Sequence, residues 1–125
     1  MVSVLQNVAI DCADPYELAT FWSKVTGCPL HPDDRPGDPE TQVLLREGPV
    51  LHFNKVPEPK TTKNRLHVCL RPETTRDEEV TRLLALGATL VTDLREADGP
   101  GWAVLADPEG NEFCVLRSNS DRART

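Results

Sequence analysis

A pattern that occurs twice, 60 residues apart, limits the possible folds of this chain more than any single motif. Asp14 to Glu17 is a capping box with proline at the first helical position, and an amphipathic helix follows that stops at Gly27. Thr75 to Glu78 is a second capping box, and the helix after it stops at Gly87. The sequence therefore predicts two equivalent helices in two related halves.

Each predicted helix follows a segment in which apolar and polar residues alternate, as expected for a strand with one buried face. These segments are Leu5–Cys12 and Arg65–Arg71, and Asn7 and His67 occupy the same position in the two copies. In the second segment, Leu66 is predicted to share the apolar face. Three further strands are predicted after each helix: Cys28–Leu30, Thr41–Arg46 and Val50–Lys55 in the first half, and Ala88–Asp93, Gly101–Ala106 and Glu112–Arg117 in the second.

The order of these elements predicts an α+β fold made of two tandem βαβββ modules, about 4–56 and 64–117, within one domain over 1–118. Each half has one helix to cover one sheet face, which leaves the other face polar. We expect the two halves to form a curved, eight-stranded mixed sheet around a cavity, with Glu112 and Cys114 facing the cavity and Phe113 and Val115 facing the helix. Residues 119–125 are expected to be a flexible tail.

Composition excludes several classes of function. The 125 residues carry a net charge of −6 with no basic cluster, so neither nucleic acid nor a membrane is an expected partner. No secretion signal is recognisable at the N-terminus. The cysteines are widely spaced, without a C-x-x-C pair, which favours reduced thiols in a cytoplasmic protein. They are Cys12, Cys28, Cys69 and Cys114.

The doubled βαβββ pattern resembles the vicinal oxygen chelate (VOC) superfamily, which includes glyoxalase I, bleomycin-resistance proteins and extradiol dioxygenases. NVAIDCADPYELATFW looks like the opening strand and helix of that family. VPEPKTTKNRLHVCL and DPEGNEFCVL are similar to a glyoxalase-like subfamily common in actinobacteria and mostly of unknown function. The resemblance covers Leu5 to Arg117, nearly the whole chain.

The resemblance implies a divalent metal held by four cavity-facing side chains, two from the first strands and two from the last strands of the halves. The matching positions here are Asn7, His67, His52 and Cys114. The family pattern has a carboxylate where this chain has Cys114, and His, Gln or Glu where it has Asn7. Two interpretations follow: a zinc or other divalent site on His52, His67 and Cys114, or no metal, with Cys114 as a small apolar residue.

Four other residues are candidates for ligand binding or catalysis. Glu112 lies on the same strand face as Cys114 and is the candidate general base, although no catalytic residue follows from the sequence. Asp11 and Arg65 lie on polar strand faces. Each could bind a charged group of a ligand, lie at a solvated strand end, or form an ion pair with the other. Trp102 could stack on a planar or cationic ligand or pack on a loop or partner subunit.

Two functions are consistent with these residues. The first is a homodimer, like many members of the superfamily, that binds a small organic molecule in the cavity without metal. The departure from the family's metal ligands at two of the four positions favours this function. The second is a metal-dependent lyase, isomerase or dioxygenase that uses His52, His67 and Cys114. Neither the ligand nor the presence of an enzymatic activity follows from the sequence.

Overall fold

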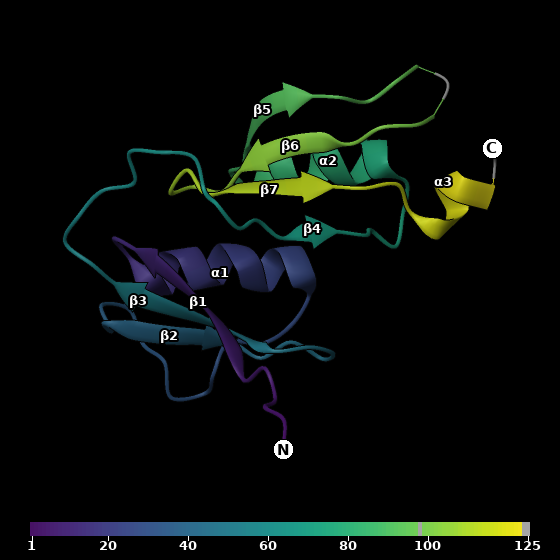
Figure 1. Ribbon diagram of the computed structural model, residues 1–125. Helices are drawn as coiled ribbons and strands as arrows, with labels where there is room; N and C mark the ends of the chain where they lie inside the picture. Colours follow the sequence, from purple (N-terminus) through teal and green to yellow (C-terminus); the bar gives the residue numbers. More distant parts are fainter. Residues whose placement is uncertain (98, 124–125) are drawn as a thin grey trace. The chain divides into compact units, whose positions relative to one another are not determined.

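A computed structural model describes residues 1–97 and 99–123 (Figure 1). The chain divides into two compact units, Met1–Lys60 and Thr61–Thr125. The helix of the first unit and the two helices of the second are all too short to cross a lipid bilayer, as far as the described residues extend.

The first unit consists of one sheet and the helix that covers it (Figure 1). Its elements are β1 (Asn7–Cys12), α1 (Pro15–Thr26), β2 (Glu40–Val43) and β3 (Val50–Lys55). The sheet order is β1-β3-β2, with β1 parallel and β2 antiparallel to β3. The predicted helix boundaries are correct: Asp14 caps the start by accepting a bond from the Glu17 amide at 3.3 Å, and Gly27 ends the helix at φ 69°.

One face of this sheet is buried beneath α1. Leu51 and Phe53 of β3, and Thr41 and Val43 of β2, are all buried. The Thr41 hydroxyl donates to the Pro15 carbonyl at 2.8 Å, which fastens β2 to the first turn of α1. Because side chains alternate along strands, the other face carries the polar residues of the same segments.

The second unit repeats this plan with one more strand and one more helix. Its elements are β4 (Cys69–Leu70), α2 (Arg76–Leu86), β5 (Thr89–Asp93), β6 (Ala103–Ala106), β7 (Glu112–Val115) and α3 (Asn119–Ala123). The sheet order is β4-β7-β6-β5, and only the β4–β7 pair is parallel. Phe113 and Val115 are fully buried, as predicted for the side of β7 that faces a helix.

The expectation of eight strands in one curved sheet is wrong. The described residues form seven strands in two sheets, one of three strands and one of four. The predicted strand Cys28–Leu30 shrinks to a single bridge between Leu30 and Val43. Pro29 and Pro32 explain this, because proline lacks the amide that would extend a ladder.

The strand predicted over Arg65–Arg71 is also shorter, since β4 contains only Cys69 and Leu70. The hydrogen-bond ladder between this segment and β7 begins at Val68, whose carbonyl accepts a bond from the Cys114 amide at 3.0 Å. Leu66 lies before that point and is 89% exposed, so its predicted place on the apolar face is wrong.

The segment predicted as a tail contains α3, and residues 124 and 125 lie outside the described residues. The carboxylate of Asp121 accepts bonds from the Ser118 amide at 2.9 Å and from the Arg76 amide at 2.7 Å. Asp121 thereby links α3 to the first residue of α2.

Candidate functional site

His52 lies near the centre of the polar face of the first sheet. Its register partners are Ala9 on β1 and Gln42 on β2. The imidazole Nδ1 is 3.1 Å from the Gln42 amide nitrogen, which donates to it, and Nε2 is 3.4 Å from a Glu40 carboxylate oxygen. These two bonds assign the proton to Nε2 and fix the ring plane. The result is a half-buried, oriented imidazole.

Asn7 and Asp11 occupy the same face as Ala9, because alternate residues of β1 point the same way. Asn7 is half-buried and its side-chain oxygen is 3.5 Å from the Gln6 amide nitrogen. Asp11 is exposed, opposite Asn54 of β3. Together with Glu40, Asp11 makes this face of the first sheet rich in carboxylate oxygens.

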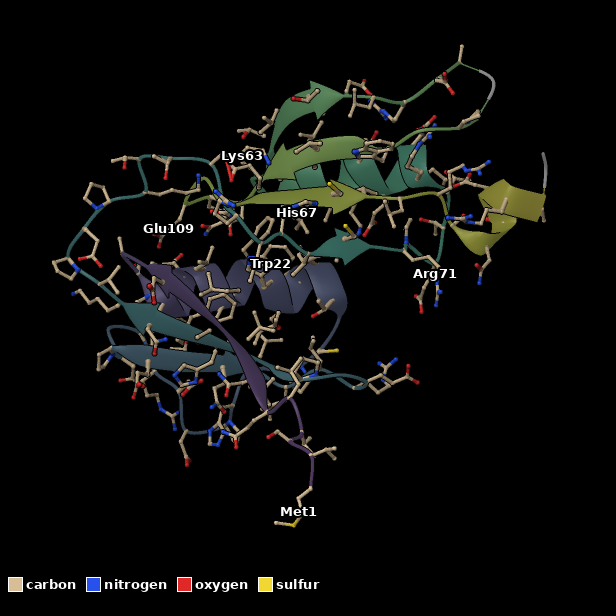
Figure 2. The ribbon with its side chains drawn as sticks, in the orientation of Figure 1. Met1, Trp22, Lys63, His67, Arg71 and Glu109 are labelled. Atoms are coloured by element: carbon tan, nitrogen blue, oxygen red, sulfur yellow. The ribbon has the colours of Figure 1, made fainter. Side chains whose placement is uncertain are left out.

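In the second unit, His67, Cys69 and Cys114 form a cluster. Cys69 and Cys114 are register partners on the parallel strands β4 and β7. His67 precedes Cys69 by two residues, on the segment that leads into β4 (Figure 2). The imidazole nitrogen and the two sulfur atoms all lie within 4.8 Å of one another. This is a possible set of one nitrogen and two sulfur ligands.

The two thiols of the cluster differ in their surroundings. Cys114 is buried and Cys69 is exposed. Burial raises the pKa of the Cys114 thiol above its usual 9.0, and the neighbouring Cys69 thiol raises it further, while the positive charge of Lys63 opposes the shift. Cys114 is therefore a neutral thiol at neutral pH unless a cation displaces its proton.

Glu112, the candidate general base, has a partner in the backbone. One of its carboxylate oxygens accepts a bond from the Asn64 amide at 2.9 Å. This bond holds the segment before β4 against the start of β7, where no backbone ladder reaches. The carboxylate thus positions the chain that carries His67.

Trp102 and Arg65 are both exposed in the second unit. Trp102 is 42% exposed, and its carbonyl accepts from the Leu94 amide at 2.9 Å. Gly101 before it has φ 93° and lies so close to Leu94 that a Cβ would stand 2.0 Å from the Leu94 carbonyl oxygen. Arg65 lies in the loop before β4. Neither side chain contributes a ligand atom to the cysteine cluster.

The structure therefore groups the predicted site residues within each unit. His67 and Cys114 come together in the second unit, whereas His52 belongs to the first unit with Asn7 and Asp11. Cys69 completes the cluster and was missed as a candidate. Its alternation with His67, two residues apart on one predicted strand face, is the signal in the sequence that points to it.

The sequence matches the family described as "Glyoxalase-like domain" over residues 7–116. The chain belongs to this family. The match spans both units and agrees with the glyoxalase-like resemblance predicted from the doubled pattern. No curated protein matches the sequence significantly.

Solved structures share the fold of this glyoxalase-like protein at low sequence identity. A glyoxalase/bleomycin resistance protein/dioxygenase family enzyme from Burkholderia phytofirmans PsJN is 22% identical, with a TM-score of 0.69 over 90% of this chain and 97% of that one. A mutant of the fosfomycin resistance protein FosX from Listeria monocytogenes, complexed with Mn(II) and 1S,2S-dihydroxypropylphosphonic acid, is 15% identical, with a TM-score of 0.69 over 100% of both chains. TioX from Micromonospora sp. ML1 is 20% identical, with a TM-score of 0.64 over 92% and 98%.

Proposed function

We propose that this glyoxalase-like protein binds a small organic molecule, and that the polar face of the β1-β3-β2 sheet contributes to the binding site. The observation that carries the proposal is the orientation of His52 by Gln42 and Glu40. Two side chains already hold the imidazole in one orientation. A ligand that binds to these groups therefore loses little further entropy in ordering them.

The chemistry of this face favours a particular class of ligand. Glu40 and Asp11 supply carboxylates, and Gln42, Asn7 and His52 supply groups that both donate and accept hydrogen bonds. The proposed ligand is therefore a polar molecule with a cationic or hydrogen-bond-donating group, which the two carboxylates attract. Arg65, Glu112, Trp102 and the cysteine cluster are the further candidates of the second unit.

The residues do not fit the kind of metal centre that the complex of FosX with Mn(II) suggests. Mn(II) prefers carboxylate, carbonyl and water oxygens as ligands. Among the four positions that match the family's ligands, Cys114 is a thiol and Asn7 an amide, and neither is a carboxylate. The nearest carboxylate on β7 is that of Glu112, which holds the Asn64 amide. We therefore derive no manganese chemistry for this chain.

Nuclear magnetic resonance of metal-stripped protein tests the proposal, because each histidine ring reports separately. The probes are a fragment library of polar amines and 1S,2S-dihydroxypropylphosphonic acid, the compound bound by FosX. We expect saturable shifts of the His52 ring with amine fragments, lost in His52→Gln. His31→Gln is the matched control, because His31 lies on a loop of the same unit and accepts a bond from the Asp33 amide. Binding that His52→Gln leaves intact would contradict the proposed face.

The cluster of His67 and Cys114 supports the alternative, a metal-dependent lyase, isomerase or dioxygenase that also uses His52. This alternative requires His52 for metal uptake and requires turnover of a substrate. If His52→Gln abolishes metal uptake by the reduced protein, the alternative replaces the proposal of ligand binding that needs no metal. Equal uptake by His52→Gln and parent contradicts it.

The proposed working form is a cytoplasmic homodimer, as in many members of the superfamily. Sedimentation equilibrium of the untagged chain measures this directly. A mass of twice 13.9 kDa supports the dimer, and a mass of 13.9 kDa at all concentrations contradicts it.

A further inference from the structure

The cysteine cluster of the second unit has the dimensions of a metal site. In zinc proteins, Zn–S bonds are about 2.3 Å and Zn–N bonds about 2.0–2.1 Å, so tetrahedral ligands stand about 3.5–3.8 Å apart. The three ligand atoms here lie within 4.8 Å of one another. A closure of at most about 1.3 Å forms the site. Rotation of the exposed His67 and Cys69 side chains supplies it.

The ligand types select the class of metal. Two sulfur atoms and one imidazole nitrogen suit zinc and softer ions, whereas manganese, magnesium and calcium prefer carboxylate, carbonyl and water oxygens. The three residues supply no oxygen ligand. Three protein ligands also leave one tetrahedral position open for water or a further ligand.

The backbone holds the buried thiol in place before any ion arrives. Cys114 lies between β4 and β6 in the sheet, paired with Cys69 on one side and Val104 on the other. Its amide donates to the Val68 carbonyl at 3.0 Å, and the Leu116 amide donates to the Leu70 carbonyl at 2.9 Å. These two bonds bracket Cys69, so the strand ladder sets the separation of the two cysteine backbones.

We propose that His67, Cys69 and Cys114 bind one zinc ion through a histidine nitrogen and two thiolates. Binding displaces the thiol protons, which pass to solvent. The site lies wholly within the unit Thr61–Thr125 and requires no residue of the first unit. It differs from the ligand set implied by the superfamily, because Cys69 replaces His52 and no carboxylate takes part.

Zinc titration of the full-length, untagged protein tests this inference. The protein is reduced, stripped with a chelator and titrated with zinc against a chromophoric competitor, and separately with manganese. We expect one tight equivalent of zinc and much weaker manganese binding. Cobalt, used as a spectroscopic substitute, should give the thiolate-to-cobalt charge-transfer absorption that only sulfur ligation produces.

Cys69→Ser is the decisive variant, because Cys69 is exposed and its replacement leaves the core intact. We expect zinc affinity to fall at least about 100-fold. Losing a residue that only supports a metal ligand already lowers affinity by up to about 100-fold, and losing a ligand itself should cost no less. Circular dichroism verifies that the variant is folded. Cys12→Ser, a thiol of the other unit, is the matched control and should bind zinc like the parent.

His52→Gln distinguishes this site from the metal-dependent alternative. We expect parental zinc affinity in His52→Gln and weakened affinity in His67→Ala. Unchanged zinc affinity in a folded Cys69→Ser variant would overturn the inference, as would the absence of the charge-transfer absorption in the cobalt protein. The binding of small molecules is tested separately, on metal-stripped protein. Neither result of the zinc experiments therefore decides the small-molecule proposal.

Discussion

Cys69 and Cys114 are register partners across the β4–β7 ladder, yet the thiol of Cys69 is exposed and Cys114 is only 6% exposed. The exposed thiol is at the edge of the sheet and the buried one is in its interior, because β7 has a strand on each side and β4 has one only on the β7 side. The thiol of Cys69 is therefore open to solvent, whereas that of Cys114 is largely covered.

This asymmetry predicts how the cysteines react with an alkylating reagent. In the reduced, stripped protein, we expect iodoacetamide to modify Cys69 first, because Cys12, Cys28 and Cys114 are buried. If the proposed site binds zinc, saturating zinc should slow the modification of Cys69 at least about tenfold, since a coordinated thiolate is blocked. Mass spectrometry of peptides measures both rates. Equal rates with and without zinc would speak against coordination by Cys69.

Arg76 should contribute more to stability than an ordinary surface arginine. Its Nη1 group donates to the carbonyls of Gly99, Pro100 and Gly101 at 2.9, 3.0 and 2.9 Å, and its side chain is buried. We expect Arg76→Met to lower the free energy of unfolding by about 3 kcal/mol, because three part-buried carbonyls lose a charged donor. Urea denaturation measures the change. The exposed Arg71→Met is the control, and an equal effect in both variants would refute this role.

Gly101 and Gly27 provide a matched pair for testing a close backbone approach. Both have positive φ, 93° and 69°, so alanine at either position carries the left-handed penalty of about 1–2 kcal/mol. Only at Gly101 would the new Cβ meet backbone, 2.0 Å from the Leu94 carbonyl oxygen, whereas at Gly27 nothing lies within 4 Å. We expect Gly101→Ala to lower the free energy of unfolding by about 2 kcal/mol more than Gly27→Ala. Equal losses in urea denaturation would show that the turn moves freely.

The attachment of α3 should depend on pH through Asp121. Burial alone would raise the pKa of Asp121, but hydrogen bonds from the Ser118 and Arg76 amides outweigh it and hold the pKa below its usual 3.8. A lowered folded-state pKa means that the stabilisation is complete above pH 3.8 and is lost as the pH falls through the lowered value.

Amide chemical shifts of Arg76 and Ser118, followed while the pH is lowered, measure this transition. We expect both amides to titrate together below pH 3.8. Asp121→Asn should remove the transition, because the amide side chain does not ionise in this range. A transition that persists in Asp121→Asn would assign it to another carboxyl group.

The sequence predicts those parts of the fold that local chemistry determines. The capping residues Asp14 and Thr75 and the glycines Gly27 and Gly87 fix the bounds of α1 and α2, and all four act as expected. The prediction of a strand over Cys28–Leu30 is wrong, and the structure has a single bridge there. Strand pairing depends on a partner strand as well as on local propensity, and Pro29 limits that pairing.

The candidate site was only partly predictable, for a related reason. The position of Cys114 follows from the alternation of β7, but its contact with Cys69 depends on the register between β4 and β7, which no local pattern specifies. The partners of His52 also come from another strand, since Gln42 and Glu40 lie on β2. Residue types on a strand face are therefore readable from sequence, whereas their neighbours across strands are not.

The parallel pairing of β4 with β7 has a consequence for the newly made chain. Cys69 and Cys114 are 45 residues apart in the sequence, with α2, β5 and β6 between them. At about 5–20 residues per second, a ribosome takes roughly 2–9 seconds to add that length. During this interval His67 and Cys69 have left the synthesis site without the strand that completes their cluster. Each new chain therefore contains His67 and Cys69 before the strand that supplies Cys114 has been made.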